Sequence, residues 1–170
     1  MNHEQAKPAS INDSELTRLL ITARLERHPA PMPELLAQAV APEAAYELQR
    51  QHAAAFLAKF GGHAAVIKLG GGGVAAMAAL GLTGPFRGPI FSQYIHDSPA
   101  NLKRTDFLEL CLIETEIAFL LAEDIEGSSS PPDRESLARA IGAIIPCIEI
   151  ADSRFANPAK GSPAAILADF

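Results

Sequence analysis

Two apolar stretches that carry glutamates decide the fold: FLELCLIETEIAFLL, residues 107–121, and PCIEIA, residues 146–151. Strand side chains alternate between two faces, so Glu114 and Glu116 project side by side from one face of the first stretch. Glu149 is the lone carboxylate of the second stretch, between two isoleucines that take the opposite face. The patterns predict strands over residues 107–121 and 147–151, with acidic side chains in apolar surroundings.

Carboxylates in such strands need a positive partner, because burying an unpaired charge is costly. The partner is a Lys or Arg side chain or a metal ion; alternatively, the glutamates lie on a wet, charged sheet edge. Glu114, Glu116 and Glu149 together can form an oxygen-rich site for a hard divalent cation, and Mg²⁺ and Mn²⁺ prefer such ligands. The Cys and His spacings typical of zinc sites are absent from the sequence.

Lys68 lies in the short apolar run AAVIKL, residues 64–69, which predicts a buried strand. A lysine in a buried strand either pairs with a carboxylate or has a lowered pKa suited to acid–base chemistry. The first alternative gives Lys68 a salt bridge to one of the three glutamates, and the two alternatives are compatible. Lys68 is therefore the candidate catalytic residue.

Four glycines, Gly70 to Gly73, follow this run. Gly71-x-Gly73-x-x-Ala76 matches the glycine pattern of dinucleotide-binding proteins. That fold requires a second parallel strand, but residues 81–89 are rich in Gly and Pro. A flexible backbone turn beside a ligand explains the glycines better, and a dinucleotide-binding fragment remains as an alternative.

The remaining sequence predicts an α+β fold in which helices come first. A capping box at Asn12 and Glu15 starts a helix that ends at His28-Pro29. Further helices or helical turns are predicted over residues 34–39, 43–60, 74–80 and 133–143, and another strand over 90–95. The last sixteen residues, from Phe155, contain Pro158, Gly161 and Pro163 and are predicted to be irregular.

Composition excludes several classes of protein. The 170 residues include 14 Lys+Arg and 20 Asp+Glu, with no basic run, which argues against nucleic-acid binding. The sequence has no signal-peptide pattern and no apolar stretch of membrane-spanning length. Cys111 and Cys147 lie in apolar sequence and are predicted to be reduced core residues. We therefore expect a cytoplasmic protein without a membrane partner.

Arg154 and the histidines are weaker candidates. Arg154 follows the Glu149 strand and can clamp a substrate carboxylate through its guanidinium, although an internal ion pair with Asp152 or a neighbour is at least as plausible. Four histidines are scattered without metal-ligand spacing, which favours surface or hydrogen-bonded positions over ligation: His28, His52, His63 and His96.

The chain resembles the bacterial 2-keto-4-pentenoate hydratases and oxalocrotonate decarboxylases of the fumarylacetoacetate hydrolase superfamily. The resemblance covers nearly everything from residue 15 onward. It is carried in order by PEAAYELQ (42–49), IKLG (67–70), LG (80–81), GPF (84–86), GPIF (88–91), SPA (98–100), ETEIAF (114–119), Asp124, PCIEIADSRF (146–155) and AD (168–169). The glutamate pair, the later glutamate and the Asp-Ser-Arg after it are specific when found together.

The resemblance implies that Glu114, Glu116 and Glu149 hold Mg²⁺ or Mn²⁺, and it places Lys68 at the substrate. We expect Gly70 and Arg154 to contact that substrate, a small 2-oxo or 2-hydroxydienoic acid from aromatic-compound breakdown. The implied reaction is hydration of the dienoate. Decarboxylation of a 2-oxo-3-enedioate is the alternative, because both use the same enolate chemistry.

The chain also departs from the family's pattern. Gly71 stands where the family commonly has Thr or Ser, and family chains normally continue well beyond the point that matches Asp169. We therefore expect a truncated protein: a helical lead-in over residues 1–62, then an incomplete mixed β-roll over 63–170. It is expected to form homo-oligomers or to associate with a related full-length subunit, and a non-catalytic role in such a complex is a further alternative.

Overall fold

The computed structural model describes residues 13–38, 40–125 and 130–169. The chain forms two compact units. Unit 1 combines Met1–Glu109 with Ser153–Phe170, and unit 2 is Leu110–Asp152. The predicted boundary between a lead-in over residues 1–62 and a catalytic domain over 63–170 stays a prediction.

Unit 1 begins with three helices: α1 (Asp13–Glu26), α2 (Glu34–Ala37) and α3 (Pro42–Phe60). They confirm the predicted helices, although Asn12 of the predicted capping box lies outside the described residues. Pro42 opens α3, where its missing N–H costs nothing, and Gly61 ends it with a positive φ of 73°. The buried residues of α3 recur at helical spacing and form one stripe: Ala45, Leu48, Gln49, His52 and Phe56.

Strands β1 (Ala64–Gly70) and β2 (Phe86–Phe91) pair antiparallel, with helix α4 (Val74–Leu80) between them in sequence. The strand predicted over residues 90–95 is wrong at its end, because residues 92–94 form a 3-10 turn and the strand starts earlier, at Phe86. Pro89 is tolerated inside β2 because a two-stranded sheet leaves each strand with an open edge. The antiparallel pairing also removes the dinucleotide-binding alternative, which needs parallel strands.

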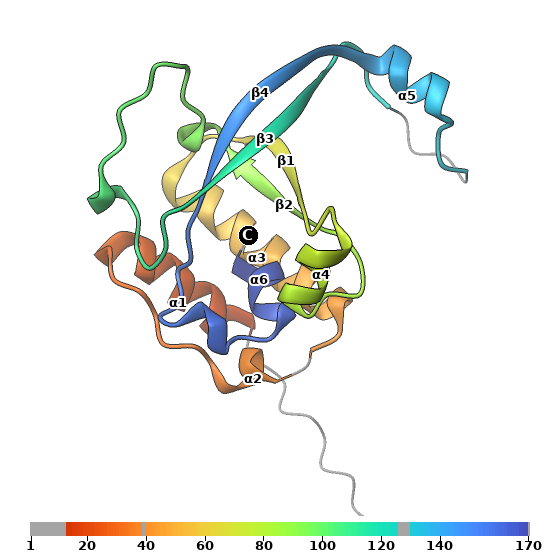
Figure 1. The fold of residues 1–170 in the computed structure, drawn as a ribbon. Coiled ribbons are helices and arrows are strands. Elements are labelled where there is room, and N and C mark those ends of the chain that lie inside the picture. Colours follow the sequence, from red (N-terminus) through yellow and green to blue (C-terminus); the bar gives the residue numbers. More distant parts are fainter. Residues whose placement is uncertain (1–12, 39, 126–129, 170) are drawn as a thin grey trace, which may run out of the picture. The chain divides into compact units, whose positions relative to one another are not determined.

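Helix α6 (Pro163–Asp169) is the element that the sequence analysis missed. Residues from Phe155 were predicted to be irregular, and this is wrong for α6, since Pro163 occupies a first-turn position where proline suits a helix. Figure 1 shows α6 against α3 within unit 1. Small side chains allow this close packing, and Ala164, Ala165 and Ala168 join the core with residues of α1, α2 and α3.

Unit 2 contains a two-stranded antiparallel ribbon of β3 (Leu112–Leu121) and β4 (Ile141–Ala151). Helix α5 (Arg134–Ala140) comes directly before β4 in the chain. In Figure 1 the two strands run together as a long twisted ribbon. Strand β3 starts later than predicted. Strand β4 is longer than predicted and takes the last residues of the predicted 133–143 helix. The strands pair in register from Leu112 opposite Ala151 to Leu120 opposite Ala143.

These elements confirm an α+β fold. The described strands form two separate two-stranded sheets, β1–β2 and β3–β4, and the mixed roll stays a prediction. Among the described residues, no helix has the length and apolar character needed to cross a bilayer.

Candidate metal centre

The β3–β4 ribbon has two faces of opposite character. Residues directly opposite each other in an antiparallel pair share a face. One face, which we call the acidic face, carries Glu114 opposite Glu149 and Glu116 opposite Cys147. The other, the aliphatic face, carries four cross-strand pairs: Ile113–Ile150, Thr115–Ile148, Ile117–Pro146 and Phe119–Ile144. The register therefore gathers all three predicted ligands on one face.

One carboxylate oxygen from each of Glu114, Glu116 and Glu149 lies within 4.8 Å of the others. Oxygen ligands bind Mg²⁺ or Ca²⁺ at about 2.0–2.6 Å, so oxygens around one ion lie roughly 3–5 Å apart. The spacing and the all-oxygen donor set fit a hard divalent cation. Three protein ligands would leave the other coordination positions to water or substrate oxygens.

The electrostatics of the acidic face favour a cation. Like charges directly opposite on paired strands destabilise a sheet, and Glu114 faces Glu149 in this way. The sequences of β3 and β4 themselves contain no lysine or arginine. An ion bound between the carboxylates would replace this repulsion with attraction.

Burial does not contribute to that argument, and here the sequence prediction was wrong. Glu114 and Glu116 are exposed and Glu149 is half-buried. The predicted alternative of a wet, charged strand describes the surroundings of the pair correctly. Cys111 and Cys147 are free thiols, but both are exposed rather than core residues. The apolar sequence around them forms a ribbon with open faces instead of a core strand.

Lys68 belongs to unit 1, on β1, and is half-buried rather than enclosed. Its Nζ lies 5.9 Å from the centroid of the Phe86 ring, which is a cation–π distance. The catalytic role of Lys68 and its pairing with a glutamate stay predictions.

Gly70 lies at the end of the same strand, directly opposite Phe86 on β2. A Cβ at Gly70 would stand 2.2 Å from Cζ of the buried Phe86 ring. The close approach of the Phe86 ring therefore explains why this position is a glycine, since any larger residue would clash with the ring. Substrate contact by Gly70 stays a prediction, and it would have to come from the backbone.

Arg154 is buried in an ion pair with Asp169, whose nearest atoms, Nε and Oδ1, are 2.6 Å apart. The Arg154 Nη2 also donates to the Asp169 backbone oxygen, at 2.6 Å. Asp169 Oδ2 accepts from the Ser153 hydroxyl and from the Arg154 backbone N–H, each at 3.0 Å. The internal ion pair considered for Arg154 is thus present, and its partner is Asp169. Substrate binding by Arg154 stays a prediction.

Asp169 and its surroundings are the polar cluster that sequence reasoning overlooked, although Asp169 belongs to the resemblance. Burial, followed by the positive charge of Arg154, lowers the pKa of Arg24 to about 10. Burial, then the charges of Arg24 and Arg154, holds the pKa of His52 well below its usual value, so His52 is neutral. His52 Nδ1 lies 3.3 Å from the Ala168 carbonyl oxygen at the end of α6.

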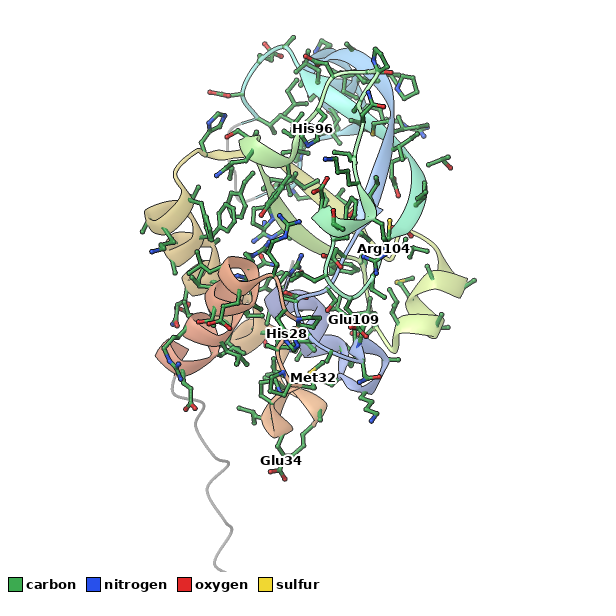
Figure 2. The ribbon with its side chains drawn as sticks, turned by 90° about the vertical axis from the view of Figure 1, so that its left-hand side faces the viewer. His28, Met32, Glu34, His96, Arg104 and Glu109 are labelled. Atoms are coloured by element: carbon green, nitrogen blue, oxygen red, sulfur yellow. The ribbon has the colours of Figure 1, made fainter. Side chains whose placement is uncertain are left out.

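Three further histidines are exposed, which agrees with the predicted surface positions: His28, His63 and His96. His28 and His96 come from separate segments of unit 1 (Figure 2), and His63 lies on the surface before β1. Two small cavities of unit 1, of ≈120 and ≈170 Å³, are lined by residues such as Pro42, Leu82 and Leu167. Neither is lined by a predicted site residue, and both are smaller than the roughly 300–1,000 Å³ typical of ligand pockets.

Comparison with solved structures identifies the fold. A structure of 4-oxalocrotonate decarboxylase from Pseudomonas putida G7, complexed with magnesium and adipate, matches with a TM-score of 0.81 and 21% identity over 97% of this chain. The chain has the fold of that decarboxylase. A structure of the same enzyme complexed with calcium and acetate matches with a TM-score of 0.79 and 20% identity. No family model matches the sequence, and no curated protein is significantly similar to it.

The predicted resemblance is confirmed by this shared fold. The chain spans 61% and 60% of the lengths of the two decarboxylase chains. Both solved structures contain a divalent cation, magnesium in one and calcium in the other.

Proposed function

We propose that the chain is a metal-dependent lyase that acts on a small 2-oxo or 2-hydroxydienoic acid. The observation that supports this most is the convergence of Glu114, Glu116 and Glu149 within 4.8 Å on one face of the ribbon. The shared fold with a decarboxylase solved in complex with magnesium adds to it.

Glu114, Glu116 and Glu149 would hold Mg²⁺ or Mn²⁺. The chemistry supplied by such an ion is Lewis-acid stabilisation of the negative charge that develops on a 2-oxo acid. The carboxylates would bind and orient the ion. Because Glu114 and Glu116 are exposed, substrate oxygens have room beside them.

Lys68 is the proposed proton-handling or carboxylate-orienting residue. Lys68 is a half-buried residue on a strand rather than on a loop, which limits the positions of its ammonium near the Phe86 ring. Gly70 and Arg154 are proposed to line the substrate site, Gly70 through its backbone. For Arg154, the ion pair with Asp169 fixes the plane of the guanidinium and so restricts how it can meet a carboxylate.

Hydration of a 2-hydroxydienoate, as in the 2-keto-4-pentenoate hydratases, is the proposed reaction. Decarboxylation of a 2-oxo-3-enedioate is the second candidate, and the observation that favours it is the likeness to solved structures of a decarboxylase. Both reactions need stabilised enolate charge, so the acidic face serves either one.

The test is an ultraviolet assay with each substrate in the presence of Mg²⁺, Mn²⁺ or a chelator, with released CO₂ measured in parallel. Hydration consumes the dienoate without releasing CO₂, whereas decarboxylation releases one CO₂ for each substrate molecule consumed. We expect metal-dependent turnover that Glu114→Gln abolishes and that Glu123→Gln, an exposed glutamate outside the strands, leaves unchanged. Metal binding without turnover of either substrate would favour the non-catalytic alternative.

The role of Lys68 is tested in the same assay with Lys68→Met and Lys68→Arg. Loss of kcat in both variants, with metal affinity retained, would support proton handling. If Lys68→Arg keeps kcat and only KM rises in Lys68→Met, the residue orients the substrate carboxylate instead.

A further inference from the structure

We propose that Cys147 is a fourth, sulfur ligand of the acidic face and lets it bind a borderline-soft divalent cation such as Zn²⁺ or Co²⁺. This role rests on the proposed function, in which the three glutamates of that face hold a metal ion. It gives a task to a thiol that the proposed metal site leaves unused. The register of the ribbon, the reach of the side chains and the chemistry of sulfur support it.

The register places Cys147 at the fourth corner of a rectangle whose other three corners are glutamates. Glu114 lies directly opposite Glu149, and Glu116 lies directly opposite Cys147. The two corners on each strand are two residues apart, so all four side chains leave the same face of the ribbon. The acidic face therefore offers three carboxylates and one thiol around one point.

The dimensions of an antiparallel pair bring the thiol within reach of the same ion. Directly opposite residues have their Cβ atoms about 4.5–5.5 Å apart, and residues two apart on one strand lie roughly 7 Å apart. The three carboxylate oxygens converge within 4.8 Å. A thiolate binds Zn²⁺ at about 2.3 Å, slightly farther than a carboxylate oxygen at about 2.0–2.2 Å. Rotation about the Cα–Cβ bond of Cys147 turns its Sγ toward the glutamates, where an ion can bind it together with the oxygens.

The identity of the cation decides whether the sulfur is used. Mg²⁺ and Mn²⁺ suit oxygen ligands, so they bind the carboxylates and leave the thiol aside. Thiolate ligands favour zinc, and Co²⁺ and Zn²⁺ both bind mixed sites more tightly than Mn²⁺ does. Sulfur coordinates as the thiolate, so the proton of Cys147 passes to solvent when the metal binds.

Use of the fourth corner changes the coordination that is left for other molecules. Structural zinc sites are tetrahedral with four protein ligands, whereas a catalytic zinc keeps one position for water or substrate. Three carboxylates and one thiolate fill a four-coordinate ion completely. Cys147 therefore separates an open magnesium or manganese form from a closed zinc form, and it is a determinant of metal specificity.

Absorption spectroscopy during titration of the reduced full chain with Co²⁺ tests the sulfur ligand directly. Cobalt bound to a thiolate gives a sulfur-to-metal charge-transfer band in the near ultraviolet, and four-coordinate cobalt gives strong visible bands. We expect both in the wild-type chain. The charge-transfer band should disappear in Cys147→Ser and remain in Cys111→Ser. Cys111 is the matched control, because it is the other of the two cysteines in the sequence and lies outside β3 and β4.

Calorimetric competition measures how much the thiol contributes to binding. Zn²⁺ should displace Mn²⁺ from the wild-type chain, and Cys147→Ser should weaken Zn²⁺ binding at least about tenfold. The affinity of Cys147→Ser for Mn²⁺ should change by less than about threefold, because Mn²⁺ prefers the oxygen ligands. Retained Mn²⁺ binding also shows that the variant is folded with its carboxylates in place.

Three results would overturn this role of Cys147. One is uptake of Co²⁺ without a charge-transfer band. Another is a band that survives Cys147→Ser or that Cys111→Ser removes, and the third is equal Zn²⁺ affinity in wild type and Cys147→Ser. Each of these leaves the proposed function standing if Mn²⁺ still binds to the glutamates. A chain that takes up neither Co²⁺ nor Mn²⁺ would instead overturn the proposed metal site and the role of Cys147 together.

Discussion

The two units handle their charged and apolar groups in opposite ways. In unit 1, the Arg154 guanidinium is buried against Asp169, and residues of α6 belong to the hydrophobic core. In unit 2, three carboxylates of one sign lie together on an open ribbon whose other face exposes aliphatic side chains. Unit 1 pairs a buried charge with an opposite charge of its own, whereas the ribbon gathers three carboxylates of one sign on one face.

A similar local sequence pattern therefore has different consequences in different surroundings. Charged residues next to apolar strands occur in both units. Where the chain supplies an opposite charge, as at Arg154, the residue becomes part of the core. Where the strands bring together residues of the same charge, as at Glu114 opposite Glu149, the carboxylates lie within reach of one another on one face.

The largest effect is expected where the internal pair of unit 1 is broken. Asp169→Ala leaves the Arg154 guanidinium buried without its carboxylate and removes the acceptor of the Ser153 hydroxyl. Loss of one partner from a buried pair costs about 3–5 kcal/mol in the free energy of unfolding, and denaturant titration measures it.

The control is an exposed ion pair of unit 2, Arg139 with Glu135, whose nearest atoms are 2.9 Å apart. Both side chains are mostly exposed, so Glu135→Ala should cost no more than about 0.5 kcal/mol. Equal losses in the two variants would contradict the contrast between a closed unit 1 and an open ribbon.

A smaller effect is expected at the contact between β1 and β2. Gly70→Ala forces a methyl group into the Phe86 ring, so we expect a loss of about 1–3 kcal/mol in unfolding free energy. Gly72→Ala is the matched control, because a Cβ at Gly72 meets nothing within 4 Å. A Gly70→Ala protein as stable as Gly72→Ala would show that the ring does not pack on this glycine.

The smallest of the three effects is a pH dependence of unit 1. The folded protein holds the pKa of His52 well below its usual 6.5, so below pH 6.5 the unfolded chain binds a proton that the folded chain does not. Stability is therefore lost as pH falls from about 6.5, by up to about 1.4 kcal/mol per pH unit, until the folded pKa is reached. Unfolding at pH 7.5 and 5.5 should show a smaller difference for His52→Gln than for wild type. A variant of the exposed His63 should behave like wild type, and an unchanged slope in His52→Gln would contradict the buried neutral imidazole.

Periodicity predicted the elements that depend on local pattern. The stripe of apolar residues in α3 and the glutamate pair of β3 follow directly from periods of 3.6 and 2 residues. Convergence of Glu149 with that pair depends on the antiparallel register, which neither stretch encodes alone. The family resemblance, in contrast, implies one site for these three residues without information on the register.

Other features could not be predicted from local pattern. Helix α6 was missed because Pro158, Gly161 and Pro163 indicate irregular structure, and only packing against α3 makes so short a helix stable. The exposure of Cys147 was missed for a related reason. An apolar sequence indicates that a strand needs a covering layer. It does not indicate whether the same chain provides that layer.

Calorimetric titration of the chain with Mn²⁺ tests whether the three glutamates hold a metal ion. The three carboxylates predict one site per chain, with affinity reduced at least about tenfold by Glu149→Gln. Glu114→Gln and Glu116→Gln should weaken binding comparably, and Glu123→Gln should leave it unchanged. Binding that survives all three ligand substitutions, or no uptake by the wild-type chain, would contradict the account.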